Sequence, residues 1–203
     1  MKKLILFSSV VALVGCANTA STKQETTTTT TAMTTTTAKT EMSTTAANAS
    51  ASKTKKFVSA NGALSLTAPS KWIDMTSAAD SEDVDIALVN VSTANFITLK
   101  GDESDSVTDD TLSFFAKAAF AAFLEASGGN RDSLVTSETT IAGKKAIKGV
   151  AEVTIEGQVQ KVDLYTVKMG KQAILISHIY ATGENSEQLS KEAYDVINTL
   201  ANE

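Results

Sequence analysis

The fold is decided by residues 134–182, LVTSETTIAGKKAIKGVAEVTIEGQVQKVDLYTVKMGKQAILISHIYAT. Three glycines, Gly143, Gly157 and Gly170, divide this stretch into segments rich in β-branched and apolar residues. Such segments predict strands, here over residues 134–142, 145–156, 158–169 and 172–182. Because the connections are only a few residues long, we expect neighbouring strands to pair antiparallel.

A helix is predicted before these strands, over residues 109–127. Its apolar side chains recur at helical spacing and form one broad stripe: Leu112, Phe115, Ala116, Ala119, Phe120 and Phe123. Thr108 is the expected N-cap, with Asp109 and Asp110 in the first turn and Val107 set to contact Leu112. Gly128-Gly129 is the expected C-terminal stop. Phe114 points away from the stripe, so it is either covered by a loop or exposed, and it is a candidate partner contact.

A second helix is predicted after the strands, over residues 186–201. Its expected core face consists of Leu189, Ala193, Val196, Ile197 and Leu200. Before the first helix we expect a hairpin over residues 57–68, turning at Asn61-Gly62 in a type I′ turn and ending at Pro69. Further strands are predicted over residues 86–91 and 95–100. The fold class is therefore α+β, with a mainly antiparallel sheet of about six to eight strands packed by two long helices.

The start of the chain has the features of a secretory signal. Met1-Lys2-Lys3 is followed by an apolar run that is too short to span a bilayer, and then by Leu13-Val14-Gly15-Cys16. This tetrapeptide resembles the lipobox of bacterial lipoproteins. The resemblance implies a signal peptide over residues 1–15 and a lipidated Cys16 that holds the protein in the membrane. Since Ala17 rather than aspartate follows, it also implies the outer membrane.

Residues 16–56 predict a disordered tether between the lipid and a domain at 57–203. Thr, Ala and Ser dominate this segment, and it holds few large apolar side chains that could offset the entropy of ordering. It is either a plain spacer or a substrate for O-glycosylation. Cys16 is the only cysteine, so no disulfide is expected once it is lipidated.

Charge is divided unevenly along the chain. Residues 1–56 hold seven lysines and two glutamates, whereas residues 57–203 hold 11 basic and 21 acidic residues. A domain with ten excess negative charges repels nucleic acid and anionic lipid headgroups. We therefore expect no nucleic-acid partner, and membrane contact through the lipid alone.

The order of elements over residues 57–203 resembles the PsbP-like fold, and within it the bacterial DcrB-like lipoproteins. The resemblance is carried by Pro69-Ser70-Lys71-Trp72 after the first hairpin, the helix at 109–127, and Gly143-Lys144-Lys145-Ala146 opening a later hairpin. Tyr194 and Ile197 in the closing helix complete it. The resemblance implies an α/β/α sandwich that binds partners and has no shared catalytic residues.

His178 is the only histidine, and it shares a strand face with Ile176 and Tyr180. One interpretation is a hydrolase that pairs this ring with a serine. The other is a half-buried strand histidine whose ring nitrogens are satisfied by neighbours. The second is favoured because the chain has no G-x-S-x-G nucleophile turn.

Metal and cofactor motifs are weak. Asp102-Glu103-Ser104-Asp105 with Asp109-Asp110 could offer oxygen ligands to calcium, but the EF-hand pattern fails, since Val107 stands where glycine is needed. One histidine and one cysteine make zinc improbable. We therefore expect no metal, no cofactor and no enzymatic activity. The sequence favours an anchored envelope lipoprotein that binds an envelope protein or a small ligand; a surface-exposed lipoprotein that contacts host or other cells is the alternative.

Overall fold

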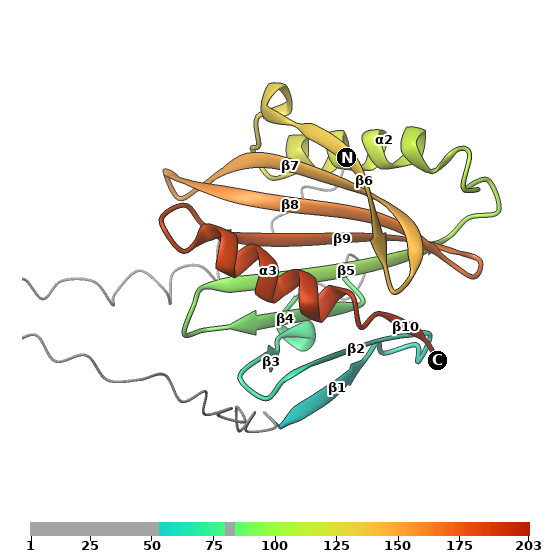
Figure 1. Ribbon diagram of the computed structural model, residues 1–203, viewed down its shortest axis with the longest axis horizontal. Helices are drawn as coiled ribbons and strands as arrows, with labels where there is room; N and C mark the ends of the chain where they lie inside the picture. Colours follow the sequence, from blue (N-terminus) through green and yellow to red (C-terminus); the bar gives the residue numbers. More distant parts are fainter. Residues whose placement is uncertain (1–52, 80–83) are drawn as a thin grey trace, which may run out of the picture.

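The computed structural model describes residues 53–79 and 84–203 (Figure 1). The predicted signal peptide, Cys16 and most of the predicted tether lie outside the described residues. The described chain forms a seven-stranded sheet, a three-stranded sheet, two α-helices and two short 3₁₀ turns at Thr76–Ala78 and Arg131–Ser133. Among these residues, no helix is long and apolar enough to cross a membrane.

The large sheet is antiparallel throughout, with strand order β3-β4-β5-β9-β8-β7-β6. Its strands are β3 (Ile73–Asp74), β4 (Ile86–Asn90), β5 (Asn95–Glu103), β6 (Val135–Ile141), β7 (Lys144–Ile155), β8 (Gln158–Met169) and β9 (Gln172–Ala181). The four strands predicted between residues 134 and 182 are confirmed within one residue at each end. Consecutive pairing of β6 to β9 brings residues far apart in sequence onto one surface.

Two tight hairpin turns have the backbone that their glycines predict. Ala142 and Gly143 between β6 and β7, and Glu156 and Gly157 between β7 and β8, all have positive φ, between 49° and 79°. Two successive positive φ angles are the mark of a type I′ turn, whose twist matches that of the flanking strands. These turns set the register of β6, β7 and β8.

The small sheet pairs β1 (Thr54–Val58), β2 (Leu64–Pro69) and β10 (Ala201–Asn202) in the order β1-β2-β10. The predicted first hairpin is confirmed, although β1 begins three residues earlier than expected. The predicted type I′ turn is wrong, because only Gly62 of the Asn61-Gly62 pair has positive φ. Asn61 instead accepts hydrogen bonds from the Ser59 hydroxyl at 2.7 Å and the Ala63 N–H at 3.0 Å, which shape a longer loop.

Helix α2 (Leu112–Ala126) begins later than predicted. Its N-cap is Thr111, and the Thr111 hydroxyl accepts the Thr108 N–H at 2.8 Å, so the residues before it form a turn of their own. Asp109 and Asp110 therefore precede the helix and do not lie in its first turn. The C-terminal stop is confirmed: Gly128 has φ +70°, and the Gly129 N–H donates to the Leu124 carbonyl at 2.7 Å.

Helix α3 (Ser186–Ile197) ends four residues before the predicted end of the closing helix. Thr199 turns the chain onto the small sheet, because its hydroxyl donates to the Thr67 carbonyl at 3.0 Å and accepts the Thr67 N–H at 2.7 Å. Leu200 keeps its predicted place in the core, but does so from the connection between α3 and β10.

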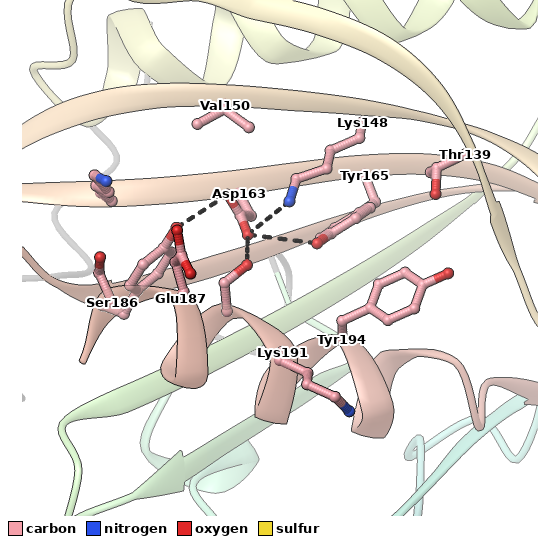
Figure 2. Close-up of a pocket in the computed structure, with 12 residues that line it drawn as sticks. Thr139, Lys148, Val150, Asp163, Tyr165, Ser186, Glu187, Lys191 and Tyr194 are labelled. Atoms are coloured by element: carbon pink, nitrogen blue, oxygen red, sulfur yellow. Dashed lines mark hydrogen bonds and ion pairs between the residues drawn. The ribbon is translucent and has the colours of Figure 1, made fainter. Parts of the chain in front are cut away.

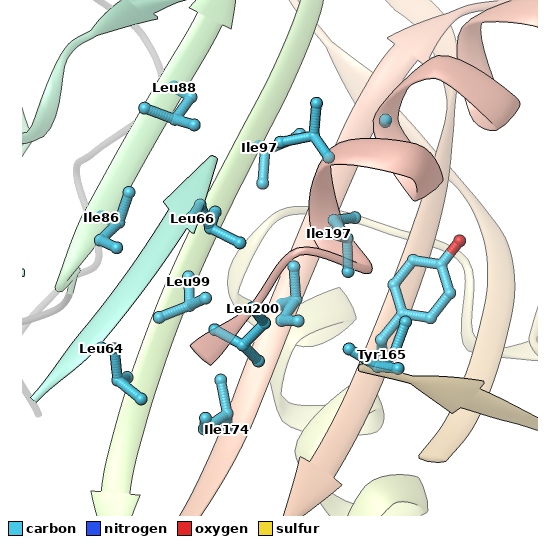
Figure 3. Packing of buried hydrophobic residues seen from close by; sticks show 14 of the residues in the cluster. Leu64, Leu66, Ile86, Leu88, Ile97, Leu99, Tyr165, Ile174, Ile197 and Leu200 are labelled. Atoms are coloured by element: carbon cyan, nitrogen blue, oxygen red, sulfur yellow. The ribbon is translucent and has the colours of Figure 1, made fainter. Parts of the chain in front are cut away.

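The hydrophobic core lies on both faces of the large sheet, as the alternation of side chains along a strand requires. On one face, α2 covers β7 and β8, with buried Leu112, Ala116, Phe120 and Leu124 packed on the sheet. On the other face, α3 and the small sheet enclose a second cluster. Figure 3 shows its labelled members: Leu64, Leu66, Ile86, Leu88, Ile97, Leu99, Tyr165, Ile174, Ile197 and Leu200.

Candidate functional site: a buried carboxylate under helix α3

A buried carboxylate, Asp163 of β8, lies at the centre of the sheet face under α3, with 1% of its side chain exposed. Lys148 of β7 donates to it at 3.0 Å, Tyr180 of β9 at 3.3 Å, and the Ser190 hydroxyl of α3 also donates (Figure 2). The Tyr165 hydroxyl makes a longer contact of 3.5 Å. Donors from β7, β8, β9 and α3 therefore surround this one carboxylate. A buried charge needs such partners to remain ionised.

These contacts change the proton affinity of the groups involved. Burial alone raises the pKa of the Asp163 carboxyl. The Ser190 hydroxyl and the Lys148 ammonium act in the opposite direction and help to lower this pKa to about 2. Burial, followed by the negative charge of Asp163, raises the pKa of Tyr180 to about 12 and also raises the pKa of Tyr165. At neutral pH the carboxylate is therefore charged and the phenols are neutral donors.

His178 is completely buried beside this cluster. Its Nε2 lies 2.7 Å from Asn95 Oδ1, while Asn95 Nδ2 donates to the Leu189 carbonyl at 3.3 Å. Since the amide must present its oxygen to the ring, Nε2 carries the proton. The ring stacks on Tyr180 with centroids 4.4 Å apart and planes 7° apart.

The other ring nitrogen, Nδ1, has no hydrogen-bond partner and lies 3.9 Å from Asp163 Oδ2. Burial lowers the pKa of His178 below its usual value of 6.5, despite the attraction of Asp163. The expectation of a half-buried ring with both nitrogens satisfied is thus wrong in two respects: the ring is fully buried, and one nitrogen is unpaired.

Ser190, Asp163 and His178 lie together, but their order is not that of a hydrolytic triad. A nucleophilic serine must give its proton to the imidazole, whereas here the Ser190 hydroxyl donates to Asp163. Within the described ranges, His178 has no hydrogen bond to a serine. The geometry fits a histidine that positions neighbouring groups and gives the hydrolase hypothesis no support.

An open cavity of about 460 Å³ lies beside the buried carboxylate, between α3 and strands β6 to β9 (Figure 2). Its walls combine cationic, acidic, hydroxyl and aromatic side chains with one valine. The lining residues are Thr139, Lys148, Val150, Lys161, Asp163, Tyr165, Tyr180, Ser186, Glu187, Ser190, Lys191 and Tyr194. This cavity is the candidate binding site.

Sequence reasoning singled out His178 but missed Asp163 and Lys148. One signal was available: Asp163 occupies an inward position of β8, on the same face as Tyr165 and Val167 and between two apolar neighbours. A charged residue at a core-facing position of a strand has to find partners. The partners themselves come from other strands and from α3. The sequence of β8 alone does not reveal which residues they are.

The other predicted site residues lie away from this cavity. Phe114 is 74% exposed on α2, across the sheet, and its ring forms a T-shaped pair with Phe115, with ring centroids 5.8 Å apart. Asp102 and Glu103 belong to β5 and pair with β9, so the proposed calcium segment is partly strand. In residues 53–79 and 84–203, no group of three or more acidic, histidine or cysteine side chains is placed to hold a metal ion.

No protein-family model matches the chain, and no curated protein is detectably similar to it. Solved structures share its fold. The cyanobacterial PsbP of Synechocystis sp. PCC 6803 has a TM-score of 0.54 at 13% identity, with 77% of this chain and 96% of that chain covered. The Saccharomyces cerevisiae Ran-binding protein Mog1p has a TM-score of 0.53 at 15% identity, covering 73% and 95%.

A protein of Bacteroides thetaiotaomicron VPI-5482 is similar at 20% identity, with a TM-score of 0.53 and 73% of this chain covered. The present chain spans only 48% of that protein. At these identities the likeness concerns the fold alone. The mostly antiparallel sheet packed by two helices is thus the fold of PsbP and Mog1p, as the resemblance of residues 57–203 implied.

Proposed function

We propose that this chain is a lipid-anchored lipoprotein of the bacterial envelope, held at the outer membrane through Cys16, whose domain binds another envelope component without catalysis. The anchor is supported by the sequence: an apolar run after two lysines leads directly to the lipobox-like Leu13-Val14-Gly15-Cys16. Stable anchoring takes more than one acyl chain, which lipidation of this cysteine would provide.

One observation carries the binding role. The innermost charge beside the cavity, the Asp163 carboxylate, is already satisfied by Lys148 and by the Ser190 hydroxyl, while the cavity itself is open. Catalysis needs a base or nucleophile poised against the substrate, whereas a preformed polar cavity on a rigid sheet is suited to recognition. The name of Mog1p as a Ran-binding protein adds that this fold can serve a protein partner.

Crosslinking in intact cells tests the proposal. The native chain and its Cys16→Ala variant are expressed at equal levels, crosslinked and purified, and incorporation of labelled palmitate is measured in parallel. We expect lipid on the native chain only, together with an envelope component that is recovered with the anchored form. Labelling of neither form would contradict the anchor, and equal recovery from both would contradict an envelope role that depends on it.

A further inference from the structure

We infer that the cavity beside α3 binds a small organic anion, a carboxylate or a phosphate ester, and that Lys161 supplies its principal charged contact. The inference deepens the proposed binding function and rests on it, because it names the chemical class of the ligand. It stands on the charges that line the cavity, the donors around them and the size of the space.

The first step concerns which charges are free. Three lysines and two acids line the cavity, and the innermost acid, Asp163, is already neutralised by Lys148 at 3.0 Å. Lys191 is exposed and pairs with Asp195 at 2.7 Å. Lys161 forms no ion pair within 4.0 Å anywhere in the described chain, although its side chain is only partly exposed.

The position of Lys161 explains why its ammonium serves the cavity. It lies on β8 two residues before Asp163, so both side chains project from the same face of the sheet. Its cross-strand neighbours are Glu152 on β7 and Tyr180 on β9. Glu152 is exposed and does not approach within ion-pair distance, which leaves Lys161 as a partly desolvated cation beside the cavity.

The second step concerns the neutral donors. The hydroxyls of Thr139 and Ser186 line the cavity, and both are partly buried. Ser186 is the first residue of α3, and its backbone N–H already donates to the Gly183 carbonyl at 3.1 Å, so the hydroxyl is the donor that it offers. Hydroxyls next to a free ammonium favour an anionic group over a cation or an apolar ligand.

The surrounding domain makes this arrangement unusual. Residues 57–203 carry ten more acidic than basic side chains, so most of the surface repels anions. Lys161, the cavity lysine that forms no ion pair in the described chain, provides a local positive charge there. Glu187 also lines the cavity and would oppose the approach of a second negative group, which favours a ligand with a single compact anionic group.

The third step concerns size and the remaining wall. A space of about 460 Å³ lies within the range of sites for small molecules. Val150 and the ring of Tyr194 add an apolar and aromatic wall (Figure 2). The ligand is therefore an organic anion with an apolar or ring-shaped body, rather than a bare inorganic ion.

The test is a titration followed by two-dimensional NMR on the full chain carrying Cys16→Ala. The probes are phenyl phosphate and benzoate, with phenol as the neutral counterpart, and together they separate phosphate from carboxylate chemistry. We expect saturable shifts at the cavity residues with one or both anions and not with phenol. Lys161→Gln should weaken the anion about tenfold, as loss of a charge-assisted hydrogen bond does, while Lys117→Gln on α2 should not.

Three results would overturn the inference: phenol binding as tightly as the anions, no saturable shift with either anion, or equal weakening by the Lys161 and Lys117 variants. Unchanged thermal unfolding of Lys161→Gln confirms that the variant is folded. If the titration gives one of these results but crosslinking still recovers an envelope component with the anchored chain, the anion site is refuted and the proposed binding function is not. Release of phenol from bound phenyl phosphate would refute the non-catalytic function while leaving the site intact.

Discussion

Lys148 Nζ lies 3.0 Å from Asp163 Oδ2, across the β7–β8 ladder and under α3. The two residues are diagonal neighbours, since Val150 is the residue directly opposite Asp163. The same carboxylate also accepts the Ser190 hydroxyl, so Asp163 links α3 to the sheet. The contact therefore bears on the stability of the domain as well as on the shape of the cavity.

Asp163→Asn should lower the free energy of unfolding by about 2–4 kcal/mol, because removing one partner of a buried pair leaves the other uncompensated. The loss is smaller than for a fully buried pair, because 26% of the Lys148 side chain remains exposed to water. Urea denaturation of the full chain measures the change. The matched control is Asp195→Asn, which removes an exposed helix pair with Lys191 and should cost less than about 0.5 kcal/mol. Equal losses in the two variants would contradict the role given to Asp163.

The buried histidine makes stability depend on pH. Burial lowers the pKa of His178 in the folded state below 6.5, so between the two pKa values the unfolded chain binds more protons. The contribution of His178 to the free energy of unfolding is therefore fully present above pH 6.5 and decreases as the pH falls below it. Denaturation at pH 7, 6 and 5 should show this decrease in the native chain and a smaller one in His178→Gln. Parallel slopes in the two proteins would show that other groups cause the dependence.

The sequence predicts the large sheet well and the ends of the helices less well. The strands are bounded by residues in their own turns, whereas the helix ends depend on contacts with residues far away in the sequence. The strands β6 to β9 are bounded by glycine turns whose requirements are written in the residues themselves. By contrast, β10 consists of Ala201 and Asn202, which have no strand preference and pair only because Thr199 holds the chain against β2. A helix predicted from hydrophobic periodicity alone therefore continues past Ile197, where α3 ends.

The same reasoning applies to the site. His178 stands out in the sequence because it is the only histidine, but its neighbours Asn95 and Asp163 come from β5 and β8, and Asn95 is held in turn by the Leu189 carbonyl of α3. Only the order of strands in the folded sheet brings them together. Phe114 was correctly separated from the core stripe, since a helical period places it opposite Ala116 and Phe120.

Gly149 should not tolerate a side chain. A Cβ at this position of β7 would lie 2.7 and 2.9 Å from atoms of the Phe120 ring and 3.0 Å from Leu134. Gly149→Ala should therefore destabilise the domain by about 1–3 kcal/mol through overpacking between β7 and α2. Urea denaturation measures this loss. Phe120→Leu should cost less in the Gly149→Ala background than in the native chain, and additive losses would contradict direct contact as the cause.

A substitution of Phe114 can test partner binding without a large effect on stability. Because 74% of it is exposed, Phe114→Ser should change the free energy of unfolding by less than about 0.5 kcal/mol. Phe120→Ala on the buried side of the same helix should cost about 3–5 kcal/mol. If Phe114 is a partner contact, the serine variant loses the crosslinked envelope component while its denaturation curve stays unchanged. Full recovery by that folded variant would remove Phe114 from the binding surface and leave the α3 face as the one to map.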